Sequence, residues 1–162
     1  MIAIVVGADN ENSCSTSIVN GASGYPTDSS CLKAGAVYVF VRSGTMWTAQ
    51  AYLKAPNAGS WQRFGSSVAI SGDRIFVGAY GEKSCTTSIV NGVSGYPSDS
   101  SCSEAGAVYV FVRSGPMWTA RAYLKAPNAR SNGYVGVSVA ASGDTIVAGA
   151  HFESSCTTSI VN

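Results

Sequence analysis

Five cysteines are the residues of this 162-residue chain with the clearest chemical potential. Cys85 and Cys102 repeat the spacing of Cys14 and Cys31, and each pair encloses a loop rich in serine, threonine and glycine. We predict one disulfide within each pair, because such a loop is too polar to hold itself together. Free thiols and metal ligands are the alternatives, although no Cys-x-x-Cys sequence or cysteine–histidine cluster occurs. Cys156 begins a third loop, and its partner would lie beyond residue 162. Disulfides require an oxidising compartment, so we expect an extracellular or cell-surface protein.

The same loops contain the candidate ligand contacts. These are Tyr25 and Asp28 in the first loop, and Tyr96 and Asp99 in the second. The alternatives are that the tyrosines pack on their own loops and that the aspartates form exposed ion pairs, which contribute little. The expected partners of the aspartates are Arg42 and Arg113, or Lys54 and Lys125.

Calcium is the metal with the nearest approach to a binding sequence. Asp9-Asn10-Glu11-Asn12 resembles the oxygen-rich loops that hold this ion. The corresponding residues 80–83 offer one carboxylate and a lysine, so we predict a solvated polar loop, no metal site and no cofactor.

The sequence contains no set of groups suited to catalysis. His151 is the only histidine, and no G-x-S-x-G, P-loop or G-x-G-x-x-G motif is present. We predict that the protein is not an enzyme and has no catalytic residues. The net charge of +1 provides no basic field for nucleic acid. No apolar run approaches the roughly 20 residues of a membrane-spanning helix.

The cysteines, tyrosines and aspartates of the two loops recur because the chain repeats with a period of 71 residues. Gly35 to Gly44 returns unchanged as Gly106 to Gly115. Such periods are typical of solenoids, propellers or arrays. We divide the chain into a partial first unit (residues 1–64), a complete second unit (65–135) and the start of a third (136–162).

Four strands are predicted in each period. The third strand is apolar on both faces, which predicts cover on both sides. The fourth alternates, and we expect Thr48, Gln50, Tyr52 and Lys54 on its solvent face. The first strand is residues 66–70 and the second is residues 74–79. The third strand is residues 36–41 in the first copy of the repeat and 107–112 in the second. The fourth is residues 46–55 in the first copy and 117–126 in the second. The predicted fold is all-β, with tandem four-stranded antiparallel blades of β-propeller type, either a closed propeller or an open stacked array.

The segment from Phe64 to Asp73, followed by Val77-Gly78-Ala79 and a later GAVYVF, resembles FG-GAP repeats. These repeats form blades of integrin α-subunit propellers and of many bacterial surface proteins. The resemblance implies a β-propeller, extracellular placement, and binding or adhesive work. The second copy departs from the pattern, because Val135 stands where phenylalanine is expected.

Taken together, these features predict a non-catalytic extracellular module with a structural or adhesive role. Its expected partners are other copies or further repeats of the same protein, arranged head to tail, and they include neither nucleic acid nor a membrane span. The alternative is a ligand-binding propeller of lectin or integrin type, assisted by calcium, with glycans or surface proteins as partners.

Overall fold

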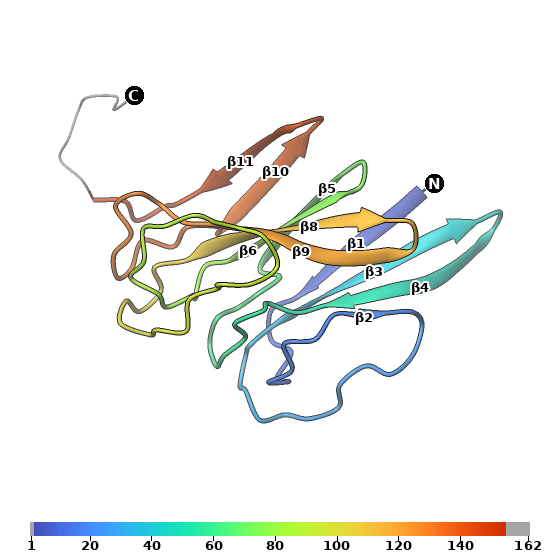
Figure 1. Cartoon of the computed structure of the whole chain (residues 1–162), viewed down its shortest axis with the longest axis horizontal. Helices are drawn as coiled ribbons and strands as arrows, with labels where there is room; N and C mark the ends of the chain where they lie inside the picture. The colour runs from blue at the N-terminus through green and yellow to red at the C-terminus, as the bar shows by residue number, and fades with distance from the viewer. Residues whose placement is uncertain (1, 155–162) are drawn as a thin grey trace.

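The computed structural model describes residues 2–154, which form strands and loops (Figure 1). In this part of the chain the strands make three antiparallel sheets. The first contains β1 (Ile2–Ala8), β2 (Val19–Asn20), β3 (Ala36–Ser43) and β4 (Met46–Leu53). The second contains β5 (Ser67–Ser71), β6 (Arg74–Ala79), β7 (Val90–Asn91), β8 (Ala107–Ser114) and β9 (Met117–Leu124). The third contains β10 (Ser138–Ser142) and β11 (Thr145–Gly149).

The predicted all-β fold of tandem antiparallel blades is confirmed. The complete second sheet has the order β5-β6-β8-β9-β7, and the first sheet repeats its last four strands as β1-β3-β4-β2. Successive sheets lie side by side, with β5 against both β1 and β10 (Figure 1). Residues 2–154 do not close into a ring.

Tight glycine turns join the first two strands of a unit. Gly72 adopts a left-handed φ of 57°, which glycine tolerates because it has no Cβ, and β5 returns directly into β6. Gly143 does the same between β10 and β11, with a φ of 56°.

One strand was missed by the sequence prediction. The short strands β2 and β7, inside the long polar loops, pair with β4 and β9. Each adds an outer strand to its sheet, which makes the complete second sheet five-stranded. Each is only two residues long, so its sequence contains no alternation that would reveal it.

The predicted solvent face of the fourth strand is wrong for Tyr52 and Lys54, which are both buried. A bulge between Val39 and Phe40 shifts the register of β3 against β4, so the alternation does not continue along the whole strand. Beyond the bulge, the long loop covers the outer face.

The hydrophobic core lies between the first two sheets and belongs to both. Val39 and Leu53 come from the first sheet, and Ile75 and Val77 come from β6 of the second. Phe64, in the connection between the sheets, meets Tyr109 and Phe111 edge-on at centroid distances of 5.3 and 5.8 Å. The two units therefore share one core.

Candidate functional site

Consecutive sheets touch through backbone at a pair of glycines. A Cβ added to Gly7 would lie 1.9 Å from the Gly65 carbonyl oxygen, and one added to Gly78 would lie equally close to Gly136 O. Any side chain at these positions would push the sheets apart. The Gly65 N–H also donates to Gly78 O, and the Gly136 N–H donates to Gly149 O. These glycines therefore set the spacing between repeat units.

Trp118 on β9 is held by the unit that precedes it. Its backbone N–H donates to Asn20 Oδ1 at 2.7 Å, and its carbonyl accepts from Asn20 Nδ2 at 3.2 Å. The indole Nε1 donates to Gln50 Oε1 at 3.1 Å. The indole is thus buried with its one polar group satisfied, as a buried tryptophan requires.

A second contact between the units centres on Asn57, which lies just after β4. The Tyr109 hydroxyl donates to Asn57 Oδ1 at 2.7 Å, and Asn57 Nδ2 donates to Pro97 O at 2.9 Å. Burial raises the pKa of Tyr109 well above its ordinary value, so this hydroxyl remains a donor at physiological pH.

The same residues are exposed on the first unit. Trp47 is 41 % exposed, whereas its counterpart Trp118 is 1 % exposed. Ile4 is 44 % exposed, whereas Ile75 is completely buried. The sequences match at these positions, so the difference arises from the preceding sheet, which covers only the second unit.

Both predicted cysteine pairs are joined as disulfides in the structure. The Cα–Cα distances are 4.8 Å for Cys14–Cys31 and 5.0 Å for Cys85–Cys102. Cys156 lies outside the described residues.

Asp28 fastens the first of these loops. It accepts hydrogen bonds from Ser13 Oγ, the Cys14 N–H and Ser30 Oγ, and Asp99 makes the equivalent bonds in the second loop. These hydrogen bonds hold the pKa of both carboxyl groups well below its usual range. The predicted ion pairs with arginine or lysine are wrong, because these carboxylates bind serine hydroxyls and backbone N–H groups.

The loop tyrosines also have internal contacts. The Tyr25 ring stacks on Tyr52 at a centroid distance of 5.6 Å, and its hydroxyl donates to Gly21 O. Tyr96 stacks on Tyr109 at 6.2 Å and donates to Gly92 O. The four candidate ligand contacts are thus engaged in holding the loops on the sheets.

Two buried ion pairs were not predicted from the sequence. Lys54 Nζ lies 2.7 Å from Glu11 Oε2, and Lys125 Nζ lies 2.8 Å from Glu82 Oε2. Each ammonium also donates to a backbone carbonyl, that of Gly35 or Gly106. Desolvation lowers the pKa of Lys54, while Glu11 opposes that shift. The expected solvated polar loop is therefore wrong at both glutamates, which anchor the loop to the sheet. The sequence signal that could have revealed these ion pairs is the recurrence of glutamate and lysine at equivalent positions of the repeat.

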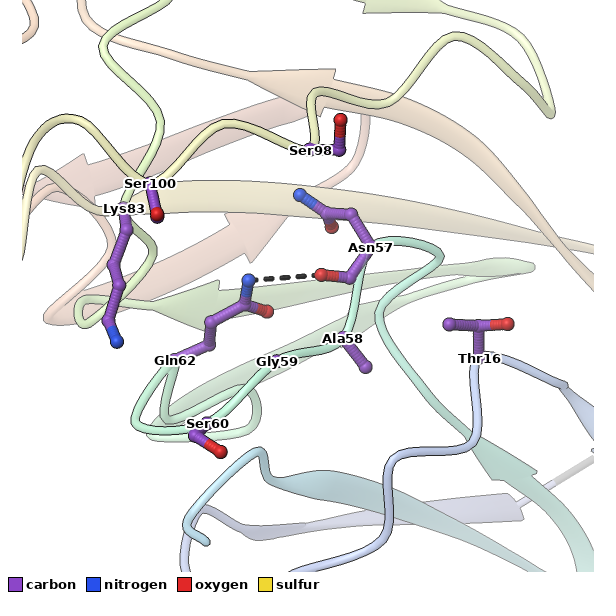
Figure 2. Close-up of a pocket in the computed structure, with 9 residues that line it drawn as sticks. All are labelled: Thr16, Asn57, Ala58, Gly59, Ser60, Gln62, Lys83, Ser98 and Ser100. Atoms are coloured by element: carbon purple, nitrogen blue, oxygen red, sulfur yellow. Dashed lines mark hydrogen bonds between the residues drawn. The ribbon is translucent and has the colours of Figure 1, made fainter. Parts of the chain in front are cut away.

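A polar cleft opens where the first two units meet (Figure 2). It has a volume of about 330 Å³ and receives Thr16 from the first loop, Gln62 from the connection, and Lys83 from the second unit. Gln62 Nε2 donates to Asn57 O at 3.0 Å, as Figure 2 shows. The lining offers hydroxyls, amides and one ammonium group. It can hydrogen-bond a small polar molecule, but it has no paired acid and base for catalysis.

No group of three or more histidine, cysteine, aspartate or glutamate residues that could hold a metal ion occurs in residues 2–154. His151 packs against the aromatic rings of Tyr134 and Phe152, at centroid distances of 5.1 and 4.3 Å. Across the described residues, no helix is long and apolar enough to cross a membrane.

Fold and interface together define a tandem-repeat β-protein whose units stack through glycine contacts and a shared core. Residues 47–111 and 118–159 match a family model described as FG-GAP repeat, and the chain belongs to that family. FG-GAP repeats occur in adhesive and extracellular proteins, and the family is generally non-catalytic. The repeats and the disulfides together indicate an extracellular protein. Comparison with curated proteins finds no match.

Proposed function

We propose that this chain is a non-catalytic structural or adhesive module, displayed outside the cell, that works by stacking on neighbouring repeat units. The observation that carries the proposal is the contrast between Trp47 and Trp118. One tryptophan is exposed and the other is covered by the preceding unit, although both stand at the same position of the repeat.

The uncovered face of the first unit has the composition of an interface. It presents Ile4, Val6 and Trp47, whose counterparts Ile75, Val77 and Trp118 lie in the shared core. Contiguous apolar surface of this kind is uncommon on soluble monomers and marks interaction sites. The occupant it fits is another unit of the same repeat, because such a unit covers the equivalent face within this chain.

Head-to-tail contact joins two different faces of the repeat unit. It is therefore heterologous, and it extends into a ring or a filament.

Sedimentation velocity over a range of protein concentrations tests the proposal. The wild-type chain is expected to associate, and Trp47→Asp is expected to weaken the association at least about tenfold, because it removes a central aromatic anchor. Met46→Asp is the matched control. Met46 is exposed, and its counterpart Met117 remains 50 % exposed beside a neighbouring unit.

A chain that remains monomeric at every concentration would contradict stacking between copies. Equal weakening by both substitutions would show that association does not use the face seen at Trp118.

A further inference from the structure

The differences between the two copies of the repeat are concentrated in one place. Residues 14–71 and 85–142 are the same at most aligned positions, and nearly half of their differences fall in residues 32–33 and 59–63. These two segments lie side by side, because backbone N–H groups of the second donate to carbonyls of the first, Trp61 to Leu32 and Arg63 to Lys33. In the second copy the same four positions hold residues of different charge, size or polarity, namely Asn132, Ser103, Tyr134 and Glu104. The first copy therefore has a surface of its own at these two segments.

Trp61 is the most unusual residue of this surface. It is 47 % exposed, so it contributes little to the core, and its φ of 69° lies in the left-handed region. A bulky side chain is rare in that region, whereas asparagine tolerates it, and Asn132 occupies the equivalent position with a φ of 61°. Neither the backbone nor the core accounts for a tryptophan here. An exposed aromatic ring on a strained backbone is typical of a contact site.

A pocket opens beside this ring, and two repeat units form it. Trp61 and Arg63 come from the first unit, and Tyr80, Lys83 and Glu104 come from the second, around a volume of about 320 Å³. Lys83 also lines the polar cleft of Figure 2, so the pocket and the cleft adjoin at this residue. The pocket supplies aromatic rings, and the cleft supplies hydroxyl and amide groups. Together they combine apolar area with convergent polar groups, as small-molecule sites do.

The open side chains of this surface are mostly cationic. Lys83 is partly exposed and forms no ion pair within residues 2–154. Lys33 lies over the Trp61 ring at 4.6 Å, where its charge adds to that of Lys83. The carboxylate in the pocket lining, that of Glu104, accepts a hydrogen bond from the Tyr134 hydroxyl at 2.6 Å. The surface therefore favours a ligand with an anionic group, and Lys83 is the partner for that group.

At the next junction the corresponding space is largely filled. Arg130 stands in place of Gly59, and its guanidinium lies 2.6 Å from Glu153 of the third unit. The hollow that these two side chains line has a volume of about 30 Å³. Ser154 stands in place of Lys83, so the cation is replaced as well. The open surface is thus a feature of the first junction, although both junctions have the same fold.

We propose that Trp61, Lys83 and the adjoining polar cleft bind an oligosaccharide that carries carboxylate groups. The apolar face of a sugar ring packs on the indole of Trp61, and a carboxylate pairs with Lys83. The remaining sugar hydroxyls donate to and accept from the hydroxyl and amide groups of the cleft. An extended peptide fits less well, because peptides of that kind pair with a strand edge, and none of the lining residues belongs to a strand. The proposal goes beyond stacking, because both units of the site belong to one chain.

Titration calorimetry of the full chain tests this proposal, with an oligogalacturonate as the acidic probe and maltotriose as the neutral one. The oligogalacturonate is expected to bind, more weakly at high salt, and at least about tenfold more tightly than maltotriose, because only the acidic probe pairs with the lysine. Trp61→Asn should weaken binding at least about tenfold, since it removes the aromatic anchor. Lys83→Ser should remove the preference for the acidic probe.

Both substitutions introduce the residue that the second copy carries at the same position, Asn132 or Ser154. If Trp61→Asn fails to fold, Lys83→Ser still tests the site, because the lysine is partly exposed. Ala22→Val is the matched control. Ala22 is exposed and lines neither the pocket nor the cleft, and the second copy carries valine there. This variant should bind the oligogalacturonate as the wild-type chain does.

An oligogalacturonate that does not bind, or that binds Trp61→Asn as tightly as wild type, would overturn the site. Equal binding of maltotriose would overturn the need for a carboxylate. Binding of poly-glutamate while both saccharides remain inert would overturn the saccharide as the ligand class. None of these results affects stacking, which sedimentation of the wild-type chain and of Trp47→Asp measures without saccharide. A chain that stays monomeric and still binds the oligogalacturonate would remove stacking and keep the site.

Discussion

Trp47 and Trp118 stand at the same position of two copies of one repeat, yet the first is exposed and the second is buried. Their immediate neighbours in sequence are the same, since Met, Thr and Ala surround both. What differs is the preceding sheet, which supplies Asn20 and Gln50 to Trp118. Burial in this protein is thus a property of the stack of units more than of the unit itself, as is expected for repeat architectures.

The largest difference between the two units is expected from alanine at these tryptophans. Trp118→Ala should cost about 4 kcal/mol of the free energy of unfolding, because it empties a fully packed site. Trp47→Ala should cost less than about 1 kcal/mol, because the side chain is partly in water. Urea unfolding of the two variants measures both values, and equal losses would show that Trp47 is covered in solution.

The buried ion pairs provide the second comparison. Lys125→Met leaves Glu82, which is 1 % exposed, as an unpaired buried charge, and should cost about 3 kcal/mol. Lys54→Met should cost less, because Glu11 is 16 % exposed and keeps some contact with water. Thermal unfolding ranks the two variants. The opposite ranking would mean that the exposure of the remaining glutamate does not determine the cost of removing its lysine.

The smallest effect is expected from the loop carboxylates in acid. Asp28 and Asp99 have folded-state pKa values below the ordinary value of 3.8, because serine hydroxyls and a backbone N–H bond the ionised form. The unfolded chain therefore binds more protons in acid, and the stabilisation is complete above about pH 5 and is lost as the pH falls below about 4. Thermal melts between pH 7 and pH 2 should show this loss, and Asp28→Asn with Asp99→Asn should make the acid limb shallower. An unchanged limb would exclude these carboxylates as its cause.

Much of the fold could be predicted from the sequence, because strands and turns are local. Arg74–Ala79 forms the expected strand, and Gly72 makes the turn before it. The ion pair of Glu11 with Lys54 was missed, because its members lie far apart in the chain and meet only after the sheet forms. The bulge between Val39 and Phe40 ends the alternation before Tyr52 and Lys54, and the long loop then covers both side chains. The interface was the hardest part to predict, because identical sequences give different burial when their neighbours differ.

Hydroxyl-radical footprinting at increasing protein concentration tests stacking most directly, since it reads Trp47, Trp118 and Met46 separately in the unmodified chain. In dilute protein, Trp47 should be oxidised much faster than Trp118. As the chains associate, Trp47 should approach the protection of Trp118, while Met46 stays reactive. Association that leaves Trp47 as reactive as in dilute protein would contradict the account that a neighbouring repeat unit covers this face.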